Sequence, residues 1–506
     1  MVNRREFLGT AAIAAGAAAG QGATGFDAEF GSALGAAEAI RKKKVSSVEL
    51  VQHAFERIRK YNPVLNAVIL QFPEQALERA RSADAALARG QNWGPFHGVP
   101  ATVKESYGME GVPTTAGVVA WKDFRPTKNA AAVERLLGAG GIVVGKTNVP
   151  VMLADWQSYN PIYGSSNNPW DVTRTPGGST GGGAAALAAG IGYLTLGSDI
   201  GGSIRVPSHF CGIYGHKPTL ELVSMQGHVP PAVNPALRNF VDLSACGPMA
   251  RSAGDLMEAM RILGGPNGAE AKAWKWSLPA ARQTRLKDFR VGYVLDDPFC
   301  PVSSEIKPAL ENTLAALEKS GAKLERGWPE GVDVRAQLNT YLYLLGSVMN
   351  QRLPAAALEA LREQYEKDKS DPMVTSAFEP HGRWLQETAR RMQARAVWQA
   401  YFETHDVFLM PVAFAPAFPH DHSEPQAART LATPEGKRRY LDMLNWISFA
   451  TLAGLPATAA PVGRTPSGLP VGLQIVGPYL EDATPIEFAA RLAEVLGGFV
   501  APKGFG

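Results

Sequence analysis

The stretch GGSTGGGAAALAAGIGYLTLGSDIGGSIR, residues 177–205, contains two serines, Ser179 and Ser203, each within a cluster of glycines. A run of small residues joins the clusters, and Lys104 lies upstream in GVPATVKES. Inside a helix or strand each glycine costs about 0.5–1 kcal/mol relative to alanine, so this density indicates a backbone that must approach another group closely. Glycine-rich backbone beside hydroxyls and a lysine predicts nucleophilic acyl transfer by a serine, with the lysine as base.

Helical and strand patterns alternate within this stretch and on both sides of it. Strands are expected at residues 64–70, 99–103, 141–145, 193–197, 290–295, 407–412, 457–462 and 471–476. Helices are expected at residues 46–59, 74–88, 130–137, 184–189, 253–263, 304–319 and 485–496. This alternation predicts an α/β fold with a large mixed, mostly parallel β-sheet that is flanked by helices on both faces.

The domain organisation is predicted to be simple. The chain has 506 residues but no repeat at a fixed period and no long low-complexity linker. We therefore expect a single domain over residues 26–506, with a helical insertion at about residues 334–405, where strand signals are few.

Residues 1–25 predict a leader and not a part of the fold. The pair Arg4-Arg5 precedes Phe7-Leu8 and a weakly apolar Ala/Gly stretch, which resembles a twin-arginine export signal. The stretch is too short for a membrane span, which needs about 20 apolar residues. We expect an exported protein, periplasmic or secreted. The alternative is a disordered tail with a chance arginine pair on a cytoplasmic protein.

The composition excludes several classes of partner. The formal net charge is only +3, and residues 41–44 form an isolated short basic run, so no nucleic-acid footprint is present. Three cysteines lie far apart without CxxC spacing and are expected to be buried free thiols: Cys211, Cys246 and Cys300. No cofactor and no metal site is predicted. The expected partner is a small-molecule amide, and a homodimer is an open possibility.

The proposed chemistry requires a base. A hydroxyl is a poor nucleophile at neutral pH and needs a base within hydrogen-bond reach. The pKa of a lysine, about 10.4 in water, falls to about 7–8 when the amine is buried. The apolar residues Pro100, Ala101 and Val103 provide such surroundings for Lys104. Glu105 would stabilise the ammonium form if it faced Lys104, so we expect its carboxylate to point elsewhere.

The second glycine cluster predicts an oxyanion site. Two glycines, Gly201 and Gly202, directly precede Ser203 at the end of a predicted strand, where backbone N–H groups can crowd a substrate carbonyl. This favours Ser203 as the nucleophile and Ser179 as a proton relay to Lys104.

The chain resembles the amidase signature family of serine hydrolases. The resemblance runs from residue 177 through VPSHFCGIYGHKPT to Thr219, and includes GVPATVKES, NNPWDVTRTPGGS, CGPMARSAGDL, AGLPATAAPVG and GLPVGLQIVGP. It implies a catalytic set of Lys104, Ser179 in a cis peptide, and Ser203, with the backbone N–H groups of Ile200, Gly201, Gly202 and Ser203 as the oxyanion donors. It also implies that Asp199 and Arg205 hold the site together, and that the fold is a large mixed sheet flanked by helices.

Four residues depart from the pattern of that family. Thr180 stands where a second serine is common, Glu105 where aspartate is usual, and Gly183 where serine or glutamate is often found. His216 interrupts a usual Gly-Leu-Lys-Pro-Thr. None of these changes removes a catalytic group, and Thr180 keeps a supporting hydroxyl. They bear on the fine geometry and on the substrate.

Three other short motifs in the chain are typical of different chemistry. Residues 177–181 match the G-x-S-x-G nucleophile elbow of α/β-hydrolases, but WDVTRTP precedes them instead of a hydrophobic strand. Ser320-x-x-Lys323 matches a penicillin-binding motif at what reads as a helix end. Residues 420–422 could be half a metal site and are better explained as a surface loop. His209 and His216 are expected to have structural or pocket-lining roles.

The sequence thus predicts an enzyme that hydrolyses a carboxamide to a carboxylate and ammonia or an amine through a serine acyl-enzyme. The alternatives are an amidotransferase A-type subunit that releases ammonia from glutamine, esterase or aryl acylamidase activity at the same site, and a non-catalytic binding protein. The substrate pocket is expected to involve Met109 and residues 156–163, 228–231 and 341–349. Their aromatic and apolar side chains suggest a hydrophobic or aryl acyl group.

Overall fold

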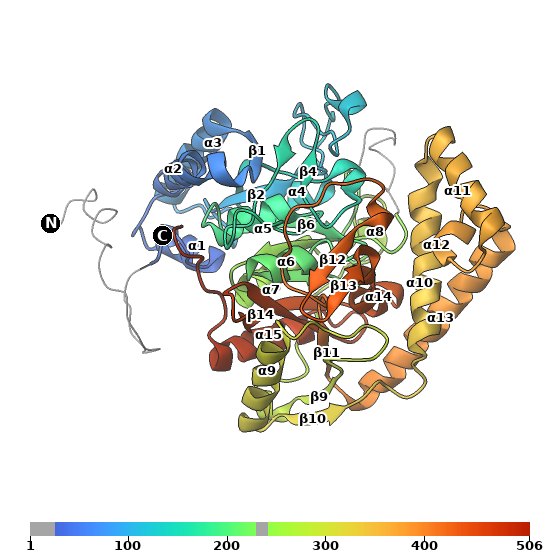
Figure 1. Cartoon of the computed structure of the whole chain (residues 1–506). Helices are drawn as coiled ribbons and strands as arrows, with labels where there is room; N and C mark the ends of the chain where they lie inside the picture. The colour runs from blue at the N-terminus through green and yellow to red at the C-terminus, as the bar shows by residue number, and fades with distance from the viewer. Residues whose placement is uncertain (1–25, 229–240, 506) are drawn as a thin grey trace.

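The computed structural model describes residues 26–228 and 241–505, so the predicted leader lies outside the described residues. Within them, eleven strands form one sheet in the order β1-β3-β2-β6-β8-β7-β14-β15-β11-β9-β10 (Figure 1). The bounds of these strands are β1 (Val68–Gln71), β2 (Pro100–Lys104), β3 (Ile142–Thr147), β6 (Leu194–Asp199), β7 (Tyr214–Lys217), β8 (Ala245–Ala250), β9 (Arg290–Tyr293), β10 (Lys323–Arg326), β11 (Val407–Pro411), β14 (Ala457–Arg464) and β15 (Pro470–Val476).

The sheet is mixed, as predicted, but it is not mostly parallel. Among the described strands, four neighbouring pairs are parallel and six are antiparallel. The antiparallel pairs include the five that run from β6 through β8, β7, β14 and β15 to β11. These central strands are almost wholly buried, and a strand covered on both faces reads as a continuous apolar run whatever its direction. Two of these strands, β7 and β8, were not among the expected ones, and every pair that they form is antiparallel.

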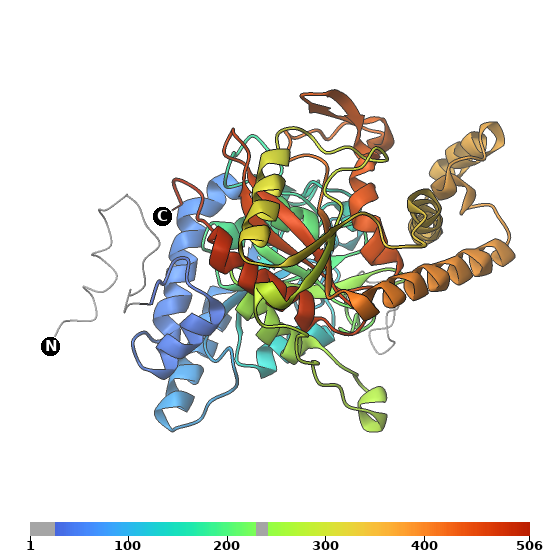
Figure 2. The same ribbon diagram turned by 90° about the horizontal axis from the view of Figure 1, so that it is seen from below.

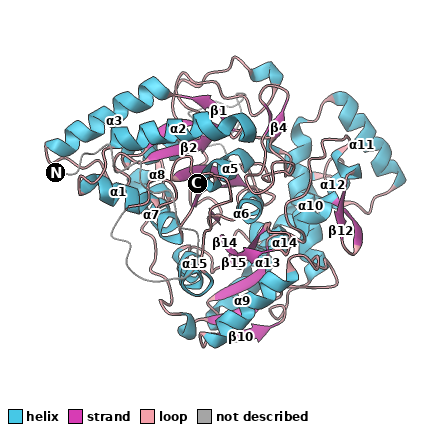
Figure 3. Cartoon of the chain, turned by 60° about the vertical axis from the view of Figure 1, so that its left-hand side comes forward, coloured by secondary structure: helices cyan, strands magenta, loops and turns pink. Residues whose placement is uncertain are grey.

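Helices cover both faces of the sheet, as Figure 3 shows. On one face α5 (Gly181–Ala188) and α6 (Arg205–Cys211) pack against each other and against the sheet. On the other face α7 (Ala253–Leu263) and α15 (Ala483–Leu496) do the same. Every residue of α5 is buried, which explains its small side chains: the helix lies too close to the strands for larger ones. The remaining helices of the body are α1 (Ala33–Arg41), α2 (Ser47–Leu65), α3 (Pro73–Ala88), α4 (Ala131–Gly138), α8 (Glu270–Ala273), α9 (Lys307–Lys319) and α14 (Leu444–Leu452).

The segment expected to be a helical insertion is helical. It consists of α10 (Val334–Met349), α11 (Ala355–Lys367), α12 (Pro372–Thr375) and α13 (His381–Thr404). Helix α10 packs on α14 and α13, whereas α11 has no buried residue. Figure 2 shows these helices, coloured orange, extending from one side of the body. The prediction of a single domain with this insertion stays a prediction.

The first long helix begins where the sequence predicts and ends later than predicted. The expected capping box is present, with Ser46 accepting the N–H of Glu49 and the Glu49 carboxylate accepting the N–H of Ser46. The helix continues to Leu65, past the expected end, and stops at Asn66 in the left-handed conformation. The strand expected at 64–70 is therefore the shorter β1. No helix in the described parts of the chain is both long and apolar enough to cross a bilayer.

Candidate active site

The predicted site residues meet at one edge of the sheet. Strands β2 and β6 are parallel neighbours, with Val103 opposite Leu196. Lys104 is the last residue of β2 and Asp199 the last residue of β6, so both lie at the carboxyl ends of adjacent strands. Ser203 follows β6 in the turn before α6, and Ser179 precedes α5, which packs on both strands. This arrangement brings Lys104, Ser179 and the 199–205 turn together.

Lys104 is fully buried, and its ammonium nitrogen contacts two hydroxyls. Nζ donates to Ser179 Oγ at 2.7 Å and to Ser198 Oγ at 3.0 Å. Burial lowers the pKa of Lys104 to about 7, although the charge of Asp199 opposes this change. A large fraction of the amine is therefore neutral near neutral pH. A neutral amine in contact with a serine hydroxyl is able to accept a proton from it.

Ser179 lies in a tightly packed backbone segment. The Gly178–Ser179 peptide bond is cis, as the family resemblance implied. A Cβ on Gly178 would lie 2.4 Å from the carbonyl oxygen of Asp155, and Gly177 has a φ of +89°. The glycines before Ser179 are therefore required because another part of the backbone passes against them. The sequence predicted that this glycine-rich backbone approaches another group closely, and at Gly178 that group is the backbone of the protein itself.

The turn that carries Ser203 is wrapped around the carboxylate of Asp199. The Oδ1 atom accepts the N–H of Gly202 at 2.9 Å, and Oδ2 accepts the N–H of Ile204 at 3.0 Å. Gly202 was predicted as an oxyanion donor, but its N–H already has this partner. Within the described residues, the other three predicted donors have no hydrogen-bond acceptor: the N–H groups of Ile200, Gly201 and Ser203.

Arg205 balances the charge of Asp199. Both side chains are fully buried, and Nη2 of Arg205 lies 2.7 Å from Oδ1 of Asp199. Burial alone would raise the pKa of Asp199, but the charge and hydrogen bonds of Arg205 outweigh this effect and hold that pKa at about 2. The remaining guanidinium hydrogens go to Ile447, Thr451 and Gln474. Arg205 therefore joins the turn to α14 and β15.

The two departures at Thr180 and Gly183 lie against each other. The backbone N–H of Thr180 donates to the carbonyl oxygen of Ser203 at 3.2 Å, which ties the two serine segments together. A Cβ on Gly183 would lie 3.3 Å from the methyl carbon of Thr180, and one on Gly197 would lie 2.9 Å from it. The methyl of Thr180 and the side chain of Thr195, which would lie 3.1 Å from that Cβ, together occupy the space that a side chain at position 183 would need.

Glu105 points away from Lys104, as expected. Its carboxylate accepts the backbone N–H groups of Thr115 at 2.5 Å and of Ala116 at 2.8 Å. Burial raises the pKa of Glu105, whereas the nearby charge of Lys146 and these hydrogen bonds oppose the change. Glu105 therefore anchors the loop after β2 and leaves Lys104 without a paired carboxylate.

Ser203 opens onto a mainly apolar pocket. Ser203 is 6% exposed and lines the pocket together with Ile200 and Gly201. The other lining residues are Leu153, Ala154, Asp155, Trp156, Leu345, Met349, Met373, Gln426, Leu441 and Leu444. Trp156, Leu345 and Met349 fall within the predicted segments. Met109 and His228 do not line the pocket, and residues 229–231 lie outside the described residues.

Several lining residues and one contact of Lys104 were missed. Met373, Gln426, Leu441 and Leu444 lie far along the chain, and no local pattern connects them to Ser203. Asp155 directly precedes the predicted segment 156–163. Ser198 was missed although it lies within the opening stretch, because its contact with Lys104 depends on the register between β2 and β6. The two glycines that directly precede Ser203 favoured that serine as the functional one.

The alternative motifs do not form reactive sites. No strand leads into Ser179, contrary to the geometry of a nucleophile elbow. Ser320 caps the end of α9 and its hydroxyl donates to the carbonyl of Leu317. His209 binds backbone groups of Ala415 and Gly472, and His216 binds Thr458 and Asp482. Among the residues that the structure describes, no group of three or more histidine, cysteine or acidic side chains could hold a metal ion.

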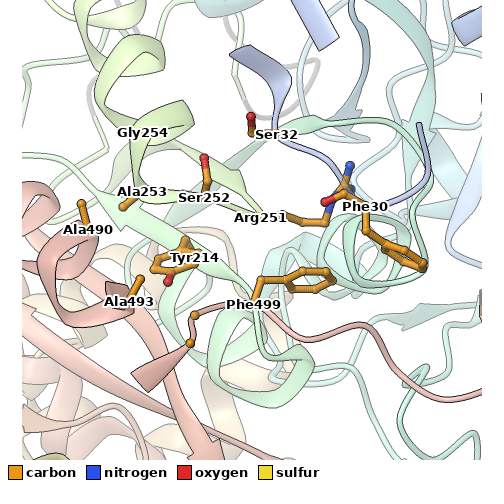
Figure 4. A pocket seen from close by; sticks show the side chains of 12 residues that line it. Phe30, Ser32, Tyr214, Arg251, Ser252, Ala253, Gly254, Ala490, Ala493 and Phe499 are labelled. Carbon is orange, nitrogen blue, oxygen red and sulfur yellow. The ribbon is translucent and has the colours of Figure 1, made fainter. Parts of the chain in front are cut away.

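A second pocket lies at the N-terminal ends of α1 and α7 (Figure 4). Phe30, Tyr214, Arg251 and Phe499 surround it, and none of the predicted site residues lines it. The guanidinium of Arg251 donates to four backbone carbonyls, those of Phe30, Gly31, Leu187 and Gly192. Arg251 therefore fastens the segment before α1 to the body of the protein.

Solved structures share this arrangement of elements. A crystal structure of an amidase is 27% identical in sequence, with a TM-score of 0.74, and the match covers 92% of this chain and all of the other. Fold and site together define an enzyme that hydrolyses amides.

The chain belongs to the amidase family, whose model matches residues 49–485. An indoleacetamide hydrolase from Bradyrhizobium diazoefficiens is 32% identical over 453 residues, which are 89% of this chain and 84% of that protein. The A-type subunit of a glutamyl-tRNA(Gln) amidotransferase from Synechococcus sp. is 30% identical over 482 residues, 89% of this chain and 93% of that one.

Proposed function

We propose that this amidase acts through an acyl-enzyme formed on Ser203. The observation that carries the proposal is the contact of 2.7 Å between Lys104 Nζ and Ser179 Oγ, in surroundings that lower the pKa of Lys104 to about 7. Neutral Lys104 takes the proton of Ser179 as Ser179 takes that of Ser203. The Ser203 oxygen then attacks the amide carbonyl.

The tetrahedral intermediate carries its negative charge on the former carbonyl oxygen. The N–H groups of Gly201 and Ser203, with that of Ile200, are available to hold this oxygen. As the C–N bond breaks, the proton returns from Lys104 through Ser179 to the leaving nitrogen, and ammonia or an amine departs. Water then attacks the ester of Ser203 by the same route and releases the carboxylate.

The substrate is proposed to be the amide of an apolar or aryl carboxylic acid. The pocket beside Ser203 is lined mainly by leucine, methionine and tryptophan side chains. Asp155 is the single charged residue among the described ones that line it, and Arg429 Nη1 contacts its carboxylate at 2.6 Å. An apolar acyl group therefore gains more here than a charged one.

Active-site labelling tests the nucleophile without knowledge of the substrate. The mature protein is treated with an alkyl fluorophosphonate, and the adduct is located by peptide mapping in the unmodified enzyme, Ser203→Ala and Lys104→Ala. We expect one adduct on Ser203 that forms far more slowly in Lys104→Ala. An adduct on Ser179 would contradict the assignment, and complete lack of labelling would contradict the mechanism.

Glutamine hydrolysis is the second candidate, because a relative named as part of an amidotransferase covers most of this chain. Free glutamine carries an α-ammonium and an α-carboxylate, and the described pocket residues offer no cation to the carboxylate. We therefore expect ammonia release from phenylacetamide to exceed that from glutamine at equal concentration. Faster release from glutamine would favour the amidotransferase assignment. Esters with the same acyl group would be hydrolysed at the same site.

We also propose that residues 1–25 direct export through the twin-arginine route, which supports a periplasmic or secreted location for residues 26–506. The support is the sequence alone: Arg4-Arg5 ahead of Phe7-Leu8. Replacing both arginines by lysine should retain the protein in the cytoplasm, as judged by cell fractionation. Equal export of the variant would contradict this proposal. A homodimer stays a prediction from the sequence.

A further inference from the structure

Two buried side chains from distant segments bind the carbonyl groups of the turn before Ser203. Trp156 Nε1 donates to the carbonyl oxygen of Gly201 at 2.7 Å. Tyr341 Oη donates to the carbonyl oxygen of Ile200 at 3.0 Å. Trp156 lies in the loop before β4 (Tyr159–Asn160), and Tyr341 lies on α10 in the helical segment. The turn is therefore held from outside the stretch that forms it.

The direction of a peptide carbonyl fixes the direction of the neighbouring N–H, because a trans peptide unit is planar and the two groups point in opposite directions. The carbonyl of Ile200 shares a unit with the N–H of Gly201, and the carbonyl of Gly201 shares one with the N–H of Gly202. The Gly202 unit is held at both ends, by Trp156 and by Asp199. Within the described residues, the unit that carries the Gly201 N–H is held by Tyr341 alone.

The backbone at this point has little stiffness of its own. Two consecutive glycines, Gly201 and Gly202, allow a wide range of φ and ψ, and Gly202 adopts a φ of +89°. A Cβ on Gly201 would meet no atom closer than 3.4 Å, so packing restrains this residue weakly. A hydrogen bond to the carbonyl is then the main restraint on where the Gly201 N–H points.

We propose that Tyr341 is a positioning residue for amide hydrolysis, and that its hydroxyl aims the Gly201 N–H at the carbonyl oxygen of the substrate. Trp156 and Asp199 hold the adjoining unit, whose N–H is donated to Asp199 and does not face the substrate. The inference rests on the proposed function, since it requires Ser203 to be the nucleophile. It assigns α10 a part in the reaction in addition to its place in the pocket wall.

The test separates the chemical step from binding with an alkyl fluorophosphonate. Ser203 oxygen bonds to phosphorus, fluoride leaves, and the serine proton passes through Ser179 to Lys104. The phosphoryl oxygen gains negative charge in this step and needs the same donors as the amide oxyanion. The limiting rate kinact therefore reports the aim of the N–H groups, whereas KI reports binding of the alkyl chain.

Three proteins are compared: the unmodified enzyme, Tyr341→Phe, and Tyr343→Phe as the matched control on the same helix. Losing an oxyanion donor altogether slows catalysis by about 10²–10³, and a misdirected donor keeps part of that effect. We expect Tyr341→Phe to lower kinact about tenfold with KI unchanged, and Tyr343→Phe to change neither. Unchanged kinact in Tyr341→Phe, or a change confined to KI, would overturn the proposal.

A second variant covers the case in which Tyr341→Phe fails to fold, as judged by its thermal unfolding. Trp156→Phe removes the other donor but leaves Asp199 on the same peptide unit, so its kinact should fall by less than threefold. A fall of tenfold or more would contradict the distinction between singly and doubly held units. If the unmodified enzyme is not labelled on Ser203, the proposed function fails first and this inference fails with it.

Discussion

At the scale of single residues, the proposed role of Lys104 as the base predicts the pH range of the reaction. The base acts only when neutral, and burial lowers its pKa to about 7. We expect kcat/KM to rise tenfold per pH unit well below this value and to level off above it. The measurement is a pH profile between about 5 and 9, and Lys104→Ala should show no such limb. Highest activity in acid would exclude a lysine base.

Lys217 shows that a low pKa does not identify the base by itself. Burial also lowers the pKa of Lys217 to about 7, but its Nζ donates to the backbone carbonyl of Pro218 and, in the described part of the chain, to no serine. Lys104 differs because its two partners are Ser179 and Ser198. Position relative to the reacting hydroxyl therefore decides the role.

Ser198 should tune Lys104. Its hydroxyl accepts a hydrogen bond from Nζ at 3.0 Å, and an acceptor stabilises the ammonium more than the amine. In Ser198→Ala the pKa of Lys104 should fall, which moves the rising limb of the pH profile to lower pH by about half a unit. Ser198→Thr keeps the hydroxyl and should restore the original limb. A shift to higher pH would show that Ser198 favours the neutral amine.

The sequence predicted three residues of the candidate site that the structure places together, and it left out the contacts that depend on distant parts of the chain. Lys104, Ser179 and Ser203 belong to motifs with local spacing, and the structure brings them together. Tyr341 fell within a predicted pocket segment, but its contact with Ile200 joins residues 141 positions apart. Such a pairing is a product of tertiary packing and has no local signal.

At the scale of elements, the helical segment supplies part of the pocket wall. Leu345 and Met349 on α10 and Met373 on α12 line the pocket beside Ser203. The scarcity of strand signals predicted this helical segment, whereas the docking of α10 on α14 depends on residues about 100 positions later. The pocket is therefore formed where the helical segment 334–405 meets the turn that carries Ser203, and the sequence predicted these two parts separately.

Met349→Trp tests this arrangement. The larger ring should shorten the pocket, so kcat/KM for a long-chain anilide should fall about tenfold while that for acetanilide stays within twofold. Met392→Trp, on the exposed surface of α13, is the control and should change neither value. Equal loss with both substrates would mean that Met349 does not select for acyl length.

At the scale of the whole molecule, the buried pair Asp199–Arg205 connects the reactive turn to the sheet and to α14. Arg205→Met would leave Asp199 as a buried charge without a counterion, which typically costs 3–5 kcal/mol in the free energy of unfolding, about the size expected here. Urea denaturation of the two proteins measures the difference. The double variant Asp199→Leu with Arg205→Met should recover part of the loss; no recovery would show that the hydrogen bonds, and not the charge, dominate.

The sheet shows where sequence reasoning stops at this scale. The strands at residues 407–412, 457–462 and 471–476 were predicted, whereas β7 and β8 in the middle of the sheet were not. The direction of each strand relative to its neighbours depends on which strands become neighbours. Strand β8 follows β7 in the chain but lies between β6 and β7 in the sheet. Pairing order is a long-range property, which is why the expected parallel arrangement was wrong for the middle of the sheet.

The fastening of residues 27–34 limits how far the protein can be shortened by an engineer. Arg251 binds the carbonyls of Phe30 and Gly31, and Asp255 accepts the N–H groups of Ala33 and Leu34. A gene that began at codon 35 would leave one buried cation and one buried anion short of these partners. Affinity tags and fusion partners therefore belong upstream of residue 26, where none of these bonds is made.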